Sequence, residues 1–326
     1  MRLLLICLLT ALLLSCHPTQ NPTQTPGGEA KEPTISIPTK QKESSNTPVP
    51  SPTSSPTEIS PLIITSAPYL LVESPAREYH PKWSNSGEIL GFVSDGVEKT
   101  EIWFQSAEGS DKRLIDIPLD GDLAFVWSAD DKSLLFDAYD ETGFLSIFTT
   151  NLETIEPIQI SEQGWGKGNP CWSPDNSQAA YVSETDIWIL PMDGAAAYRL
   201  TTTNTDEWHP YWSPDGSKMI FTSDSTGNAD LWVLDIATGE TTQLTTNETY
   251  DDRGIWSPDG EFIIFVSDRS GSDDIWLYKV ADGSEFQITD HPGIESMPSW
   301  HPDGKSIVFM AEFNGNWDIW GIDLFE

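Results

Sequence analysis

Six copies of one short motif constrain the fold of this chain more than any other feature of its sequence. The motif begins with tryptophan, continues into a Ser-Pro-Asp-Gly-type turn, and recurs at intervals of about 40–45 residues. An Ile-Trp pair or a close variant follows each copy. The regular recurrence indicates one structural unit that is used six times. The six motif tryptophans are Trp83, Trp127, Trp172, Trp212, Trp256 and Trp300.

Each repeat predicts four short strands. The first ends at the motif tryptophan, the second is an apolar run such as 263–266, the third alternates as in 274–280, and the fourth ends near a segment such as 287–289. Repeats of this length with four strands are typical of propeller blades, because one sheet cannot bury both of its faces alone. We therefore predict an all-β fold, a six-bladed β-propeller with four-stranded antiparallel blades over residues 61–326.

The end of the last repeat predicts how the ring closes. The chain ends at Glu326, directly after the third expected strand of the sixth repeat. An apolar stretch at 61–72 precedes the first repeat and belongs to none of the six. We expect this N-terminal strand to supply the missing outer strand of the last blade.

These motifs resemble the repeats of the TolB-like, WD40-like β-propeller family. The copies at Trp212, Trp256 and Trp300 carry the resemblance most clearly, and the copy at Trp127 departs from it most. The resemblance implies a propeller but no single function, because such repeats occur in transport components, peptidases, lyases and lipoproteins. TolB itself has an α/β domain before its propeller, whereas this chain has a Pro/Ser/Thr-rich segment there.

The N-terminus predicts export and lipid anchoring. Residues 1–15 are typical of a signal peptide, because Arg2 is followed by an apolar run, residues 3–14. This run is too short to span a bilayer as a helix. The sequence up to Cys16 resembles a bacterial lipobox, which implies lipidation of Cys16; simple secretion is the alternative. Residues 16–60 lack aromatic side chains, and we expect a disordered tether. The predicted location is extracytoplasmic, lipid-anchored to the cell or outer membrane of a bacterium, with no other membrane contact.

Charge narrows the class of partner. The formal net charge is −34, which disfavours binding to nucleic acid. It suits cations, basic patches on a partner protein, or solubility alone. We expect a monomer that binds an envelope protein or an extracellular ligand.

The segments before the motif tryptophans predict a candidate site. Five of the six begin with a carboxylate, and the symmetry of a propeller places them around one end of the central channel. Such a ring attracts Ca²⁺ or the basic side chains of a partner. The alternative is that each acid caps a turn or bonds a neighbouring blade. The five acids are Glu78, Asp122, Glu207, Asp251 and Glu295.

Three further residues share one register in these segments and break the six-fold symmetry. His80 and His209 belong to opposite blades, and Arg253 occupies the equivalent position in the fifth blade, next to Asp252. Blade stacking does not require this combination, so it is the best candidate for a functional cluster. The alternative is that each His-Pro pair simply starts a strand.

The predicted function is that of a binding module or scaffold, not an enzyme. Propeller peptidases resemble these repeats but carry their catalytic residues in an added hydrolase domain, and a G-x-S-x-G motif is absent from the sequence. A metal-dependent lyase acting on oligogalacturonate is the alternative, since such enzymes use channel histidines and a divalent metal. We expect no cofactor, apart from the Ca²⁺ that a carboxylate ring would attract.

Overall fold

The computed structural model describes residues 64–95, 99–109, 112–117, 119–121, 123–162, 166–313 and 315–325. These residues belong to one compact unit, 59–326. The predicted signal peptide, Cys16 and the predicted tether lie outside the described residues, as does Asp122. Within the described ranges, no helix is long and apolar enough to cross a membrane.

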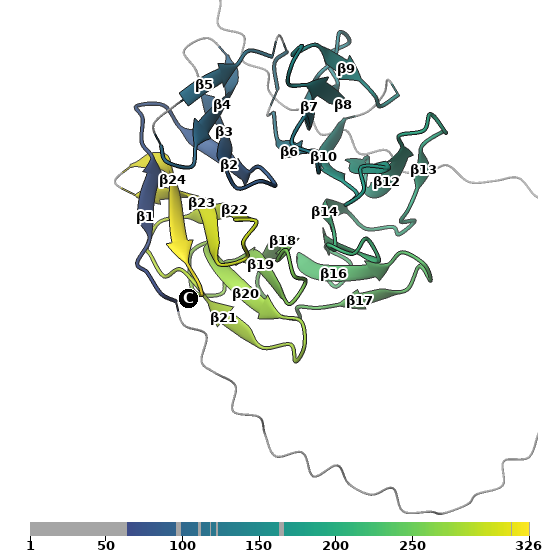
Figure 1. Ribbon diagram of the computed structural model, residues 1–326. Coiled ribbons are helices and arrows are strands. Elements are labelled where there is room, and N and C mark those ends of the chain that lie inside the picture. Colours follow the sequence, from purple (N-terminus) through teal and green to yellow (C-terminus); the bar gives the residue numbers. More distant parts are fainter. Residues whose placement is uncertain are drawn as a thin grey trace, which may run out of the picture. The chain divides into compact units, whose positions relative to one another are not determined.

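Six four-stranded antiparallel sheets are arranged in a ring, as Figure 1 shows, with their innermost strands around the central axis. This arrangement confirms the predicted six-bladed propeller. The blades, from the innermost strand outward, are β2 (Glu78–Trp83), β3 (Ile89–Asp95), β4 (Thr100–Ser106) and β5 (Lys112–Ile115); β6 (Phe125–Trp127), β7 (Ser133–Tyr139), β8 (Leu145–Asn151) and β9 (Pro157–Gln159); β10 (Lys167–Trp172), β11 (Gln178–Ser183), β12 (Asp186–Pro191) and β13 (Tyr198–Arg199); β14 (Glu207–Trp212), β15 (Lys218–Ser223), β16 (Asp230–Asp235) and β17 (Thr241–Gln243); β18 (Asp251–Trp256), β19 (Phe262–Ser267), β20 (Asp274–Lys279) and β21 (Glu285–Gln287); and β22 (Glu295–Trp300), β23 (Ser306–Phe313), β24 (Asn316–Asp323) and β1 (Tyr69–Val72).

The last blade is closed by the N-terminal strand, as predicted. β1 pairs antiparallel with β24, and Leu70 lies opposite Trp320. Val72 is buried in the core at 1% exposure. Both ends of the propeller therefore meet in one sheet, which fixes the ring.

The Ser-Pro-Asp-Gly turns start the second strand of each blade. In the fourth blade the amide of Gly216 donates to the carbonyl of Ser213 at 2.9 Å, and Gly216 has a φ of +72°. The Asp215 carboxylate accepts bonds from the amide of Ser217 at 3.0 Å and from two hydroxyls. Glycine adopts this left-handed conformation without strain, and aspartate fixes the turn through its side chain.

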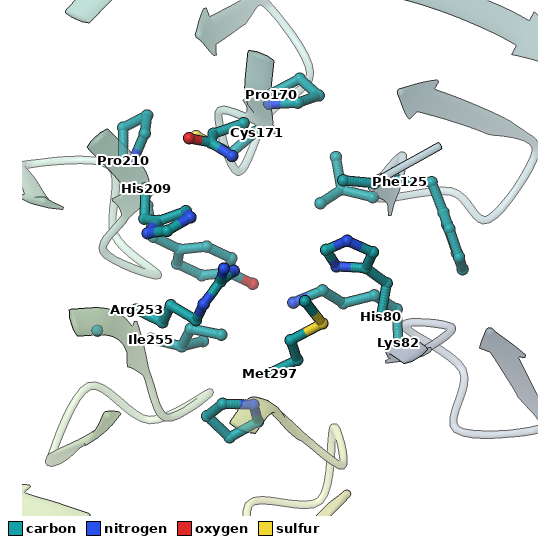
Figure 2. A pocket seen from close by; sticks show the side chains of 16 residues that line it. His80, Lys82, Phe125, Pro170, Cys171, His209, Pro210, Arg253, Ile255 and Met297 are labelled. Carbon is teal, nitrogen blue, oxygen red and sulfur yellow. The ribbon is translucent and has the colours of Figure 1, made fainter. Parts of the chain in front are cut away.

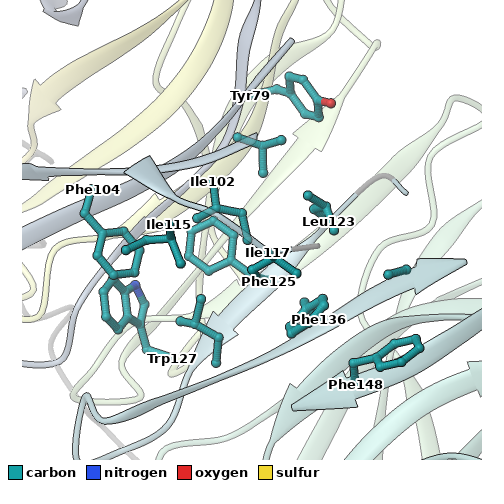
Figure 3. Close-up of a cluster of buried hydrophobic side chains, with 13 residues drawn as sticks. Tyr79, Ile102, Phe104, Ile115, Ile117, Leu123, Phe125, Trp127, Phe136 and Phe148 are labelled. Carbon is teal, nitrogen blue, oxygen red and sulfur yellow. The ribbon is translucent and has the colours of Figure 1, made fainter. Parts of the chain in front are cut away.

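The hydrophobic core lies between neighbouring blades. Figure 3 shows one cluster in which Phe104 of β4 packs beside Trp127 of β6, with ring centroids 4.5 Å apart. The Trp127 indole also donates across the blade boundary to the carbonyl of Lys82 at 3.2 Å. The tryptophan that marks this repeat therefore joins two blades.

Candidate functional site

A left-handed residue interrupts five of the six innermost strands at the same register. Each is the third residue of its strand, and the ladder to the next strand is irregular at that point. L-residues avoid this conformation at a cost of roughly 1–2 kcal/mol, and bulges of this kind redirect side chains. The five residues are His80 (φ 50°), Asn169 (52°), His209 (50°), Arg253 (58°) and Met297 (52°).

The redirected side chains meet in one cavity within the central channel, which we call the channel pocket. Its volume is about 90 Å³. In Figure 2, His80, His209, Arg253 and Met297 approach the same space from different blades. The predicted trio of His80, His209 and Arg253 is therefore brought together. Lys82, Phe125, Asn169, Tyr211 and Ile255 also line the channel pocket.

A buried carboxylate, Asp252, organises one wall of the channel pocket. It is 1% exposed, and its Oδ1 accepts bonds from Trp208 Nε1 at 3.1 Å, His209 Nδ1 at 2.7 Å and Thr222 Oγ1 at 2.7 Å. The Tyr250 hydroxyl donates to Oδ2. Burial acts to raise the pKa of Asp252, but His209 and the other donors outweigh it and hold the pKa well below its ordinary range. Asp252 is thus a charged group with its oxygens fully engaged.

Asp252 fixes the state of His209. Burial lowers the pKa of His209, the cations Arg253 and Lys82 lower it further, and Asp252 opposes them. A neutral imidazole that donates from Nδ1 to Asp252 keeps Nε2 as an acceptor. The ring is therefore held in one tautomer beside the cavity.

Two cationic side chains, Lys82 and Arg253, line the channel pocket, and neither is paired with a carboxylate that also lines it. Arg253 contacts Asp252 only through Nε at 3.6 Å, and its side chain stays 28% exposed. Burial, together with the nearby Arg253, lowers the pKa of Lys82 to about 8. Within the described part of the chain, the Lys82 ammonium has no ion-pair partner and no Asp or Glu lines the channel pocket. Both cations are therefore available to a ligand.

The predicted acidic ring is not part of this lining. Glu78, Glu207, Asp251 and Glu295 are each the first residue of an innermost strand and are at most 2% exposed. Glu78, Glu207 and Asp251 form hydrogen bonds inside the blades, as the structural alternative expects, whereas Glu295 is buried without one. These four acids therefore do not form the predicted acidic channel mouth, and the channel pocket has basic character. Their contacts are Ser74 and Ser94 for Glu78, Thr203 for Glu207, Arg269 for Asp251, and His291 for Glu295.

The donor set of the channel pocket does not fit a divalent metal. Two histidines line it, but Asp252 is engaged by four donors, and two cations share the space. No group of three or more His, Cys, Asp or Glu residues arranged to hold a metal occurs in the described ranges. We therefore derive no step through a metal ion.

Comparison with known proteins decides the family. The family model described as the TolB beta propeller domain matches residues 123–270 and 203–325. The chain belongs to the TolB β-propeller family. The uncharacterized protein Atu1656 of Agrobacterium fabrum is 32% identical over 137 residues, which are 40% of this chain and 46% of that protein. The chain therefore matches less than half of that relative's length.

Solved structures share the fold at lower identity. A putative TolB from Agrobacterium tumefaciens has a TM-score of 0.62 at 20% identity, covering 78% of this chain and 92% of that one. An oligogalacturonate lyase from Vibrio parahaemolyticus has a TM-score of 0.57 at 15% identity, covering 79% and 94%. At these identities the likeness concerns the fold alone.

Sequence reasoning missed Lys82 and Tyr211. Each lies two residues beyond a predicted histidine, on the innermost strand that carries it. The alternation of side chains along a strand is a signal that could have found them. The left-handed bulges had no such signal, because the residues at those positions are not glycine.

Proposed function

We propose that this TolB-family propeller is an extracytoplasmic, lipid-anchored binding module that holds its ligand in the channel pocket and carries out no reaction. One observation carries the proposal. Five strained positions turn five side chains, of four different kinds, into one cavity. Blade stacking alone would be served by the same residue in every blade. Strain concentrated at one cavity supports a role in binding.

Site-specific photo-crosslinking in intact cells tests this proposal. An aliphatic diazirine amino acid, close to methionine in size, replaces Met297 in the channel pocket or, as the control, Ser217 in the exposed turn after Trp212. We expect a defined adduct only from position 297, detected by intact-mass spectrometry, which registers small ligands and proteins alike. Equal adducts at both positions, or an adduct from position 217 alone, would contradict the proposal.

Oligogalacturonate lyase activity is a second candidate, favoured by the His209–Asp252 pair. A histidine whose Nδ1 donates to a buried carboxylate presents Nε2 as a general base, suited to taking the proton next to a uronate carboxylate. The test incubates the protein with oligogalacturonate and Mn²⁺ and follows the absorbance of the unsaturated product. Product formed by the wild type and lost in His209→Gln supports this candidate; a wild type without product removes it.

A further inference from the structure

We propose that the group held in the channel pocket is a carboxylate, bound between Lys82 and Arg253. This inference rests on the proposed function and names the chemistry of its ligand. The two side chains enter the cavity from β2 and β18, as Figure 2 shows. Like charges placed together in a partly dry cavity repel one another, and an anion between them removes that cost.

The arrangement of hydrogen bonds leaves the outer nitrogens of both cations available. Arg253 meets Asp252 through Nε, so no described residue accepts a hydrogen bond from its two terminal amino groups. Those two groups form the fork that matches the two oxygens of a carboxylate. Lys82 adds a single charged donor from the other wall. Together the two side chains offer the charge and the donors that bind one small anionic group.

The state of His209 adds selectivity. The Asp252 carboxylate accepts the hydrogen bond that Nδ1–H of His209 donates, and burial lowers the pKa of the ring, so His209 adds no third cation to the cavity at neutral pH. Its Nε2 accepts a hydrogen bond, which suits a hydroxyl carried by the same ligand. We therefore expect an acid that also bears hydroxyl groups to bind more tightly than a simple acid.

The remaining walls limit the size of the bound group. Phe125, Tyr211, Ile255 and Met297 surround a volume of about 90 Å³. Apolar walls of this kind exclude water and strengthen charge-assisted hydrogen bonds. The pocket suits one acidic side group of a ligand whose remainder lies outside.

The sharpest experiment is a binding titration with matched acid and neutral probes. D-galacturonate is compared with D-galactose, and N-acetylglutamate with N-acetylglutamine, by calorimetry on the full chain. We expect saturable binding of the acids, none of their neutral partners, and weaker binding at higher salt. Equal binding of acid and neutral probes, or no binding of either acid, overturns the inference.

Two variants assign the site. Lys82→Met and Arg253→Met should each weaken acid binding at least tenfold, as expected for loss of a charge-assisted hydrogen bond. Lys218→Met removes a cation that pairs with Asp235 between β15 and β16 and does not line the channel pocket, so it should leave acid binding unchanged. Lys82→Met should fold at least as stably as the wild type, because it removes a charge from beside Arg253. Unchanged affinity in both channel variants overturns the inference.

The two proposals fail in distinguishable ways. The acids are also added as competitors to the crosslinking reaction at position 297. An adduct that forms but is not displaced by any acid preserves the channel pocket as the site and rejects the carboxylate. If positions 297 and 217 give equal adducts, the channel pocket itself is rejected as the binding site.

Discussion

At the scale of single residues, Glu295 is a carboxyl group whose negative charge the fold does not accommodate. It is 0% exposed, and neither carboxylate oxygen has a hydrogen-bond partner among the described residues. The Asp274 carboxyl lies beside it, and His291 Nδ1 is 3.8 Å away. Burial, followed by Asp274, raises the pKa of Glu295 to about 8. The group is therefore largely protonated at neutral pH.

Glu295 should make the propeller less stable as pH rises. Its folded pKa of about 8 exceeds the ordinary 4.5, so its contribution is complete below pH 4.5 and is lost as pH rises through about 8. We expect the contribution of Glu295 to the free energy of unfolding to fall by roughly 5 kcal/mol over this window, because each pKa unit corresponds to about 1.4 kcal/mol. The free energy of unfolding is measured with urea at a series of pH values. Glu295→Gln should reduce its decline with rising pH, whereas Glu261→Gln on the surface should retain the decline of the wild type. Identical slopes in all three proteins would show that Glu295 is ionised in the fold.

At the scale of elements, the sequence predicted the strands well and their irregularities poorly. Turn residues such as Asp215 and Gly216 act locally, so the motif that contains them specifies a blade on its own. The bulge at Asn169 depends on the ladder with β11 and on a hydrogen bond of 3.2 Å that the backbone N–H of Asn169 donates to Asp137 Oδ2 of the preceding blade. Such cross-blade contacts have no local signature. For the same reason, the sequence placed Glu207 in the channel, whereas the structure buries it in a blade.

The bulge at Asn169 predicts an unusual order of substitutions. Glycine adopts the φ of 52° at this position without strain, asparagine adopts it with little strain, and other residues are strained there. Asn169→Ala should lower the free energy of unfolding by about 1 kcal/mol relative to Asn169→Gly, and Asn169→Val should lower it further. At Gln178, in regular strand β11, the order should reverse and alanine should exceed glycine. Guanidinium unfolding of the five variants measures both orders. The same order at both positions would mean that the bulge is not strained.

At the scale of the whole molecule, the basic character of the channel pocket contrasts with the negative net charge of the chain. The chain carries 51 acidic and only 17 Lys and Arg residues, yet Lys82 and Arg253 share one cavity. Composition averages over the surface, whereas ring closure brings together single residues that are about 170 positions apart in the chain. The closure itself could be predicted, because an incomplete last repeat and a spare apolar segment account for one another.

Removing the closing strand tests that closure. Deletion of residues 61–72 removes β1, its ladder with β24 and the buried Val72. The exposed edge of β24 also becomes available for pairing with other chains. We expect a loss on the order of 4 kcal/mol, or a Tm lower by about 10 °C, together with increased aggregation. Deletion of residues 17–58, which precede this segment, should leave the Tm of the propeller unchanged. If the two deletions have equal Tm values by calorimetry, β1 is an accessory strand, and the contacts between the first and last blades hold the ring without it.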